Sequence, residues 1–417
     1  MAGATLTTMN SALKRLYLPR LRSTLQTKTV LRSQLESSTE HTNATGLQAD
    51  VPVNIRGNQG IGARAEGGAL PTPQNQVYVT STVGYAYNYA RIRVTHPVIA
   101  ASKDDRGAWV KVVNAEMTGL ERDFGQDRNR QDFGYGYGVL AVVTAATTDN
   151  GVTGTVTVNS TQYLRVGMVF DANDGLNQTS KTADSHSILT IPSSTTFTCD
   201  NGAGDFTATI STNDYIFRED AATYESMGLV GIIDDYSQTA GIGAFIQTLQ
   251  SIDRNTYPEW NANVFENATA ATTREITPAM LDDSLLTVAE KGEGNVGFGI
   301  TSRIQFRKIA NLIVPDRRYT DTMELKGGFK SIMWSGTPIV WDKDCPIDVN
   351  GNDMLFWVDP SHLQRYQLSE MDWDDTDGNV LHRNEGYATY DATLFEYDNL
   401  GTDRPNANGA IRDLSRS

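Results

Sequence analysis

The strongest constraint on the fold is a change of hydrophobic period between residues 76 and 132. Over residues 76–98 one set of side chains (Tyr85, Tyr87, Tyr89, Arg91 and Arg93) alternates with a second set (Ala86, Asn88, Ala90, Ile92 and Val94). Alternation of this kind predicts a β-strand. Further on, the apolar residues are spaced by three and four and so share one face of a helix: Val110, Val113, Met117, Leu120 and Phe124. The chain therefore combines a long strand with a long helix.

The predicted helix runs from about residue 104 to residue 132. Asp104 and Asp105 lie at its start and Arg128 and Arg130 near its end, which is the charge order that complements a helix dipole. Gly134 is expected to stop it. About 28 residues at ~1.5 Å each give a rod of roughly 42 Å, which is long for an ordinary domain.

A glycine-rich segment, GNQGIGARAEGGALPTP, precedes the alternating stretch. Two strands flanking such a tip predict a long projecting hairpin within residues 51–100. A hairpin of two strands is marginally stable by itself in water. We therefore expect it to need a partner surface.

Residues 1–50 form a basic arm. Six basic residues precede the first acidic residue, Glu36: Lys14, Arg15, Arg20, Arg22, Lys28 and Arg32. Pro19 interrupts any helix early, so short helical pieces in an extended segment are expected. The arm has no continuous apolar stretch of the kind that a secretory signal needs, and export by that route is not expected.

The rest of the chain is acidic, with 50 Asp and Glu against 35 Lys and Arg and a formal net charge of −15. An acidic surface repels phosphate at long range, which disfavours sequence-specific nucleic-acid binding. Three interpretations of the basic arm remain open: pairing with an acidic neighbouring subunit, solvated charge, or non-specific contact with packaged DNA.

Residues 139–217 differ in composition from their surroundings. They contain sixteen threonines and only two basic residues, Arg165 and Lys181. Short strand-like runs such as GTVTVNS and RVGMVF are separated by turn-forming clusters. This stretch is predicted to be a small all-β module.

From residue 218 onward helices and strands mix. Thr277 and Pro278 are predicted to cap and begin a helix with Leu281, Leu285 and Val288 on one face and Gly292 beyond its end. GFGI is expected to be a buried strand, and a second helix is expected from Ser302 to Val314, before Pro315. The runs SIMWSGTPIVW, MLFWVDP and YATYDATLFEY predict strands. This half is therefore α+β.

The order of these parts resembles the Hong Kong-type capsid fold of tailed bacteriophages and herpesviruses. AEGGALPTP, SMGLVGIID, GGFKSIMWSGTPIVWDKDCP and MLFWVDPSHL are similar to stretches that recur in phage coat proteins. The resemblance implies an α+β fold with these parts: N-terminal arm 1–50, extended loop 51–100, spine helix 101–138 of the peripheral domain, inserted β-rich domain 139–217, peripheral domain 218–275, axial domain 276–390, and a C-terminal return to the peripheral domain 391–417.

The resemblance implies a major capsid protein that self-assembles as pentamers and hexamers into the icosahedral head shell around phage double-stranded DNA. The location implied is the virion, with assembly in the host cytoplasm. No enzymatic activity, cofactor or metal is expected, and no membrane. The partners implied are other copies of the chain, scaffold, portal and decoration proteins, and DNA without sequence specificity. The inter-subunit contact candidates are Lys14, Arg15, Arg20, Arg22, Arg64, Glu66, Tyr85, Tyr87, Arg91 and Arg93.

Two alternatives stay open. The first is an encapsulin-like nanocompartment shell, which an enclosed enzyme in place of DNA would distinguish. The second, from another class, is a secreted β-rich adhesin. The threonine-rich stretch favours the adhesin, and the missing signal segment argues against it.

One departure from the family concerns covalent chemistry. Some members cross-link an extended-loop lysine to an asparagine of a neighbouring subunit, but no lysine lies between Lys28 and Lys103. We therefore expect a shell without such cross-links. The arm is also shorter than the cleaved scaffolding segment of some relatives, which implies a separate scaffold protein or none.

The sequence contains few candidates for catalytic chemistry. The histidines are scattered without metal-ligand spacing: His41, His96, His186, His362 and His382. Neither GxSxG nor GxxxxGK[ST] occurs, and Cys199 and Cys345 are expected to be buried thiols. The acidic tracts at 171–175 and 372–378 lack the ligand spacing of a calcium loop. We interpret them as solvated turns, with weak divalent-ion binding at an inter-subunit contact as the alternative.

Overall fold

The computed structural model describes residues 29–38, 40–43, 46–97, 112–149, 153–176, 186–200, 210–236, 246–267, 272–293, 295–313, 331–348, 350–375, 379–384 and 386–416. The described chain divides into two compact units. The smaller unit contains residues 89–126 and 371–395, and the larger unit contains residues 29–88, 127–370 and 396–417.

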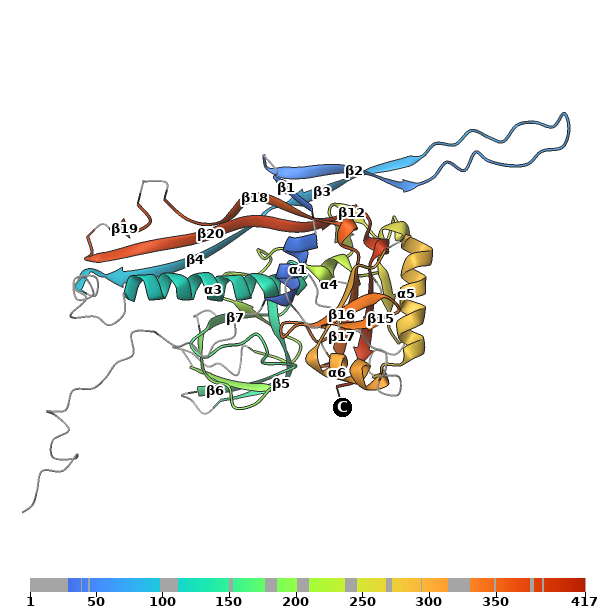
Figure 1. Cartoon of the computed structure of the whole chain (residues 1–417). Helices are drawn as coiled ribbons and strands as arrows, with labels where there is room; N and C mark the ends of the chain where they lie inside the picture. The colour runs from blue at the N-terminus through green and yellow to red at the C-terminus, as the bar shows by residue number, and fades with distance from the viewer. Residues whose placement is uncertain are drawn as a thin grey trace, which may run out of the picture. The chain divides into compact units, whose positions relative to one another are not determined.

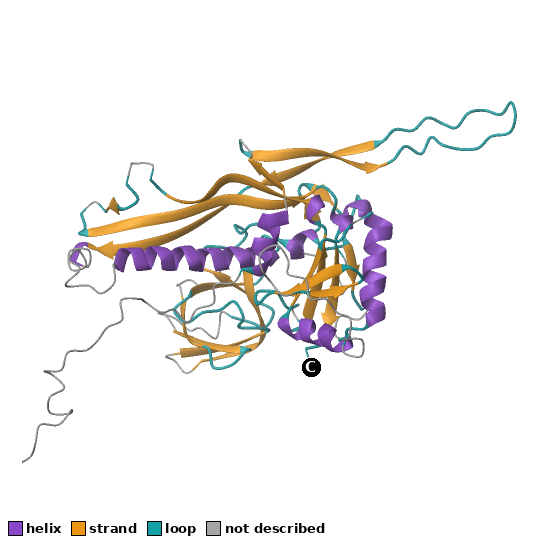
Figure 2. Ribbon diagram, viewed as in Figure 1, coloured by secondary structure: helices purple, strands orange, loops and turns teal. Residues whose placement is uncertain are grey.

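Helices and strands are spread along the whole described chain (Figures 1 and 2). The helices are α1 (Val30–Ser38), α3 (Val112–Phe133), α4 (Leu229–Ile232), α5 (Pro278–Gly292) and α6 (Arg303–Leu312), with short turns η1 (Pro258–Trp260), η3 (Pro360–His362) and η4 (Pro405–Ala407). The first ten strands are β1 (Glu40–Asn43), β2 (Gln48–Arg56), β3 (Val77–Gly84), β4 (Ala86–Thr95), β5 (Val139–Asp149), β6 (Thr153–Val158), β7 (Val169–Asn173), β8 (His186–Thr190), β9 (Thr196–Asp200) and β10 (Tyr215–Arg218). The others are β11 (Thr248–Leu249), β12 (Ile252–Asp253), β13 (Asn263–Phe265), β14 (Phe298–Thr301), β15 (Ile332–Trp334), β16 (Thr337–Trp341), β17 (Asp353–Val358), β18 (Leu363–Trp373), β19 (His382–Arg383), β20 (Thr389–Thr402) and β21 (Gly409–Leu414).

The alternating stretch is two strands rather than one. β2 and β3 pair antiparallel. β3 ends at Gly84, and the new strand β4 begins at Ala86, after Tyr85. β4 pairs with β20 and not with the hairpin. The alternation predicted for β4 is present, because its side chains are alternately more and less exposed along the whole strand. The expected hairpin therefore ends at Gly84, and the second half of the stretch belongs to another sheet.

The long helix is α3. It ends at Phe133, and the Gly134 amide donates to the carbonyl of Gln131 at 2.7 Å, as expected of a helix stop. Phe124 is buried, and Val113, Met117 and Leu120 are partly buried on the same face. The predicted start at Asp104 and the residues up to 111 lie outside the described chain.

Residues 139–218 contain six strands that close into a barrel in the order β10-β5-β6-β9-β8-β7. The strands β6 and β9 alternate strictly between inward and outward side chains. The barrel has a hydrophobic core of its own, which includes Val156, Phe170, Phe197 and Cys199. Such closure leaves no free edge for the strands to expose.

A six-stranded sheet forms a second architectural element, in the order β13-β21-β17-β14-β16-β15. Every residue of β14 and β17 is buried, as predicted for the GFGI run of β14, and the MLFWV run forms the predicted strand β17. Helices α5 and α6 pack on this sheet, because Leu281 and Ile309 share a core with Trp357. The indole Nε1 of Trp357 donates to Ser284 Oγ of α5 at 2.8 Å.

The starts of these two helices agree with the sequence. Thr277 caps α5 by accepting from the Met280 amide at 3.3 Å, and Ser302 caps α6 by accepting from the Gln305 amide at 3.3 Å. The end of α5 differs. Gly292 is the last helical residue, and Glu293 takes the left-handed conformation at φ 50°. Gly292 is needed inside the helix because a Cβ there would lie 2.0 Å from the Asn406 carbonyl oxygen.

The last two long strands belong to different sheets. Within residues 391–417, which are predicted to return to the peripheral domain, β21 lies between β13 and β17 in the six-stranded sheet. β20, in contrast, belongs to a sheet with β18, β19 and β4. Single-sequence periodicity cannot show this, because pairing partners are separated by many residues.

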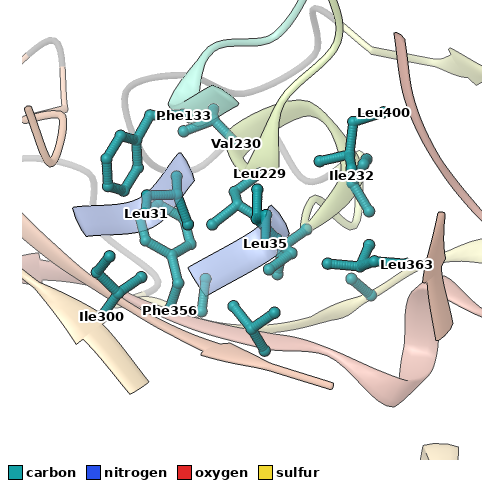
Figure 3. Close-up of a cluster of buried hydrophobic side chains, with 14 of the residues drawn as sticks. Leu31, Leu35, Phe133, Leu229, Val230, Ile232, Ile300, Phe356, Leu363 and Leu400 are labelled. Carbon is teal, nitrogen blue, oxygen red and sulfur yellow. The ribbon is translucent and has the colours of Figure 1, made fainter. Parts of the chain in front are cut away.

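The main hydrophobic core of the larger unit includes part of the predicted arm. Leu31 and Leu35 of α1 are completely buried among Phe133, Leu229 and Phe356, as Figure 3 shows. Two core side chains cap the start of α1. Asp342 Oδ2 accepts from the Leu31 amide at 2.9 Å, and Asn129 Oδ1 accepts from the Arg32 amide at 3.0 Å. The arm therefore folds into the subunit from Val30 onward, earlier than residue 51.

Candidate inter-subunit surface

Among the described residues, the loop that joins β2 and β3, residues 57–76, forms the longest exposed segment. Figure 2 shows it extending from the ends of the two strands as a long irregular hairpin. Eighteen of its twenty residues are exposed, and Gly60 and Pro71 are partly buried. Ile61 and Leu70 are 86% and 87% exposed. Exposed apolar side chains on both sides of a loop tip give that tip contact area that its own chain does not use.

Two predicted contact residues lie at this tip. Arg64 folds back on the loop, since its Nε donates to the Ala69 carbonyl at 3.0 Å. A tight turn follows, in which the Gly68 amide donates to the Ala65 carbonyl at 2.9 Å. Glu66 lies within that turn and is exposed. Both charged side chains are therefore accessible at the end of the hairpin.

The base of the hairpin is anchored to the larger unit. Arg56, the last residue of β2, pairs with Glu259 and lies over the ring of Tyr257 with its Cζ 5.6 Å from the ring centroid. The carboxylate of Glu259 raises the pKa of Arg56 through a side-chain hydrogen bond. The Thr82 amide of β3 donates to the Gln250 carbonyl at 2.9 Å. The strands are therefore held at their base while the loop stays exposed.

Tyr85 and Tyr87 lie at the junction of β3 and β4. Tyr87 is exposed and packs edge-to-face against Tyr397 of β20, with ring centroids 5.2 Å apart. Tyr85 is partly buried, its hydroxyl has no hydrogen-bond partner in the described chain, and burial raises its pKa. Tyr87 therefore keeps accessible surface, and Tyr85 contributes mainly to packing.

Arg91 and Arg93 are engaged within their own chain. Both guanidinium groups bind Asp391 of β20, and Arg93 Nε donates to Asp391 Oδ1 at 2.8 Å. The two arginine side chains remain 56% and 55% exposed while that of Asp391 is 8% exposed. These hydrogen bonds, with that of Arg93 the largest cause, lower the pKa of Asp391 to about 2. The two arginines therefore stabilise the pairing of β4 with β20 within their own chain.

The remaining candidates, Lys14, Arg15, Arg20 and Arg22, lie outside the described residues. The basic residue of the arm that the structure describes, Arg32, is buried rather than solvated. It pairs with Glu396 and lies 3.8 Å from Asp132 Oδ2.

Arg32 belongs to a buried network of six charges that sequence analysis does not reveal. Its members are three arginines and three carboxylates: Arg32, Arg128, Arg365, Asp132, Glu396 and Asp398. Arg365 Nη2 donates to both oxygens of Asp132 at 3.1 Å, and its Nη1 donates to Asp398 at 2.7 Å. Burial raises the pKa of Asp398, but Arg128 and Arg365 outweigh it and hold that pKa below its usual value. Equal numbers of opposite charges make burial tolerable.

A second charged group joins α3 to the barrel. Asp127 Oδ1 accepts from Arg130 Nε at 3.1 Å and from Arg218 Nη2 at 2.8 Å. Burial raises the pKa of Asp127, but these guanidinium groups outweigh it and lower the pKa. Arg130 also lies over the ring of Tyr163, at 5.9 Å from the centroid. The Tyr163 hydroxyl donates to the Asp344 carbonyl at 2.7 Å, so the barrel is attached at two places.

The described residues contain no group of three or more His, Cys, Asp or Glu that could hold a metal ion. Cys199 and Cys345 are buried thiols, as predicted, and they form no disulfide. Burial raises the pKa of the Cys345 thiol well above its ordinary value.

In the acidic tract 171–175, Asp171 accepts from the Asp220 amide at 2.9 Å. Within the described helices, none is long and apolar enough to cross a membrane.

The sequence matches no protein-family model and no curated protein. Its similarity is to solved structures. A chain of the capsid asymmetric unit of cyanophage A-1(L) is 14% identical, with 99% of each chain covered and a TM-score of 0.63. The chain has a phage-capsid fold. A chain from the capsid of an empty GTA particle is 9% identical, with 99% of this chain and 100% of that chain covered and a TM-score of 0.51.

This capsid fold extends over essentially the whole chain and includes the hairpin, α3 and the sheets in one match. At 14% identity the shared feature is architecture and not side-chain chemistry. The order of arm, hairpin, long helix and α+β remainder is therefore the sequence feature on which the expected fold rests.

Proposed function

We propose that this chain is the major capsid protein of a tailed bacteriophage and self-assembles as pentamers and hexamers into an icosahedral head shell around double-stranded DNA. The observation that carries the proposal is the phage-capsid fold over 99% of both chains. The exposed loop 57–76 supports it, because the loop offers surface that the subunit itself does not bury.

The parts of the capsid fold are assigned by position. α3 is the spine helix, the β2–β3 hairpin with its loop is the extended loop, and the six-stranded sheet with α5 and α6 forms the axial domain. The barrel of residues 139–218 is an inserted domain. Its ends support that assignment, since Val139 of β5 lies opposite Phe217 of β10 in an antiparallel pair. Residues 1–28 are the basic arm that precedes α1.

The physical properties of the chain suit a shell subunit. An anchored hairpin with an exposed apolar tip loses conformational entropy when a neighbour orders it, and the contacts formed offset that cost. The buried network of six charges and the capped α1 hold the subunit together in the absence of neighbours. The loop can therefore adapt to slightly different surroundings in pentamers and hexamers while the core stays constant.

The partners proposed are other copies of the chain, together with scaffold, portal and decoration proteins. Contact with packaged DNA is non-specific, and Lys14, Arg15, Arg20 and Arg22 are the arm residues proposed for neighbour contact. The net charge of −15 argues against tight binding of phosphate over most of the surface. The proposed role is structural rather than enzymatic, in the virion after assembly in the host cytoplasm.

Negative-stain electron microscopy of the expressed chain, alone and with its scaffold partner, tests the proposal. Closed shells or capsomer rings are the expected result. Dispersed monomers in both samples would contradict a shell-building role. The content of shells recovered from infected cells separates the two shell functions, because DNA supports a phage capsid and an enclosed enzyme supports a nanocompartment.

A further inference from the structure

The outer face of α5 carries exposed negative charge that its own chain does not neutralise. Asp283 and Glu290 are exposed and share one face with Leu286, at spacings of three and four residues. Leu286 is 69% exposed. Among the described residues, neither carboxylate has an ion pair. Asp282, on the flank of this face, differs because it accepts from Trp334 Nε1 at 2.9 Å.

The outer face of α6 carries the opposite charge. Arg303 and Arg307 are exposed one turn apart on this helix, with Asn311 a further turn along. Within the described chain these two arginines form no ion pair. Lys308, which lies beside them, is bound by Glu275 at 2.7 Å and by the Ser415 carbonyl at 2.8 Å. Of the three described basic residues of α6, Arg303 and Arg307 therefore have a positive charge that no carboxylate of the described chain compensates.

Both helices pack on the same six-stranded sheet. Leu281 of α5 and Ile309 of α6 belong to the same core over the six-stranded sheet. In the view of Figure 1, α5 runs lengthwise beside the sheet and α6 lies at its lower end. The two helices therefore lie at different places around the sheet, and within the described chain no ion pair joins Asp283 or Glu290 to Arg303 or Arg307.

We propose that the Asp283–Leu286–Glu290 face of α5 binds the Arg303–Arg307 face of α6 of a second copy of this chain. The inference rests on the proposed shell function and names surfaces by which neighbouring subunits recognise each other. A contact between two different surfaces of identical chains is heterologous, and it closes into a ring when the rotation between copies allows. Opposite charge on the two faces favours contact between α5 of one copy and α6 of the next. Like charge disfavours contact between two α5 helices or between two α6 helices.

The dimensions of the two faces agree. Asp283 and Glu290 are seven residues apart, about 10 Å along the helix, and Arg303 and Arg307 are four residues apart, about 6 Å. The long arginine stems span the difference, and each guanidinium can bind a carboxylate through two nitrogens. Leu286 lies between the two carboxylates on the exposed face of α5 and offers an apolar contact at the centre of the proposed pairing.

Charge reversal tests the pairing. The double variants D283K/E290K and R303E/R307E place like charges against each other, and each is expected to weaken ring association at least about a hundredfold. The fourfold variant D283K/E290K/R303E/R307E exchanges the two charges and is expected to restore rings. D283E/E290D and R303K/R307K keep the charges and are the matched controls. Circular dichroism and the unfolding midpoint establish that each variant is folded.

A mixture of the two double variants gives a sharper result. Each contact then needs one copy of each variant, so only rings with an even number of subunits can close. Native mass spectrometry is expected to show hexameric rings and no pentameric ones. Folded reversal variants that assemble like the unmodified chain, or a folded fourfold variant that does not recover, would overturn this pairing and leave the shell function intact. Failure of the unmodified chain to assemble would overturn the proposed function and the pairing with it.

Discussion

Arg128 of α3 donates through Nε to Oε2 of Glu396 at 3.0 Å, and both side chains are only 1% exposed. The same guanidinium binds Asp398 and donates to Ser226 Oγ at 2.9 Å. α3 and β20 are therefore joined inside the larger unit by charged groups and not by apolar packing alone. Such a pair depends on both partners, because either charge alone is costly to bury.

Replacement of Arg128 is expected to destabilise the subunit strongly. Arg128→Met leaves Glu396 and Asp398 with fewer compensating donors, and removal of one member of a buried pair costs about 3–5 kcal/mol of unfolding free energy. Urea denaturation followed by circular dichroism measures the change. The double variant Arg128→Met/Glu396→Gln is expected to recover part of it, since one uncompensated charge is removed.

A matched control uses the exposed pair of Arg56 and Glu259, whose side chains are 45% and 43% exposed. Water and salt screen such a pair. Arg56→Met is therefore expected to leave the urea midpoint almost unchanged. Equal losses in Arg128→Met and Arg56→Met would contradict the structural importance of burial in the network.

The buried network shows where sequence-based prediction stops. Arg32 and Glu396 are 364 residues apart and meet in a buried ion pair. In the sequence Arg32 is one of six basic residues of an arm, and nothing in its spacing indicates a partner. The same limit applies to Arg91 and Arg93, which the alternation places correctly on one face of β4 but whose partner Asp391 lies about 300 residues away. The local sequence pattern predicts which side chains share one face of a strand. The residues that pack against that face are determined by the tertiary fold.

The strand pair of β4 and β20 is expected to weaken in acid through Asp391. Its pKa is about 2 in the folded chain against an ordinary 3.8. A carboxyl with a lowered folded pKa stabilises the fold above its unfolded pKa and loses that contribution as the pH falls toward the folded value. Asp391→Asn is therefore expected to be less stable than the unmodified chain at pH above about 4 and to approach it near pH 2.

Unfolding midpoints of the two proteins across this pH range test the prediction. Glu370→Gln, at an exposed position of β18, is the control and is expected to show no such convergence. A constant difference between Asp391→Asn and the unmodified chain at every pH would mean that the lowered pKa of Asp391 does not contribute to stability.

Deletion of residues 62–75 is expected to weaken assembly and leave the monomer folded. The deleted residues hydrogen-bond mainly to one another, as Arg64 does with Ala69, while the anchors at Arg56 and Thr82 remain. Sedimentation of assembled particles and thermal unfolding of the monomer measure the two effects. The double substitution Ile61→Ser/Leu70→Ser keeps the loop length and is expected to weaken assembly in the same direction. A monomer that no longer folds after the deletion would show that the loop is part of the core.

Mature shells are expected to contain no lysine–asparagine cross-links through the extended loop. The described loop, residues 57–76, contains no lysine that could provide the amine. Denaturing electrophoresis of purified shells should therefore show single-chain bands. Ladders of covalent oligomers would overturn this expectation and would direct attention to Lys28 or Lys103, the nearest lysines on either side.

Some elements could be located closely from sequence because the signal is local. Thr277 followed by Pro278 gives the start of α5, and Gly134 gives the end of α3. The division of the alternating stretch at Tyr85 could not be found in this way. The more buried side chains are at odd-numbered positions in β3 and at even-numbered positions in β4, so the alternation changes phase at Tyr85. This change follows the choice of partner, which is β2 for β3 and β20 for β4.

The barrel is expected to fold without the rest of the chain. It is closed, so none of its six strands needs a partner from outside, and its interior contains large apolar residues such as Phe170 and Phe197 in edge-to-face contact at 5.3 Å. Its two ends meet in the antiparallel pair of β5 and β10. A fragment of residues 138–219 should therefore unfold cooperatively in urea, and Phe197→Ala should destabilise it by about 3–5 kcal/mol.

The complementary deletion completes the test of an inserted domain. Joining residue 138 to residue 219 through a short glycine linker should leave the six-stranded sheet folded. It also removes Tyr163, which donates to the Asp344 carbonyl, and Gln162, which donates to the carbonyl of Lys343 at 2.7 Å. Some loss of stability near residues 343–345 is therefore expected, with no loss of the main core. Failure of both the fragment and the deleted chain to fold would contradict an inserted domain. The barrel and the rest of the subunit would then each need the contacts that join the barrel to α3 and to residues 343–348.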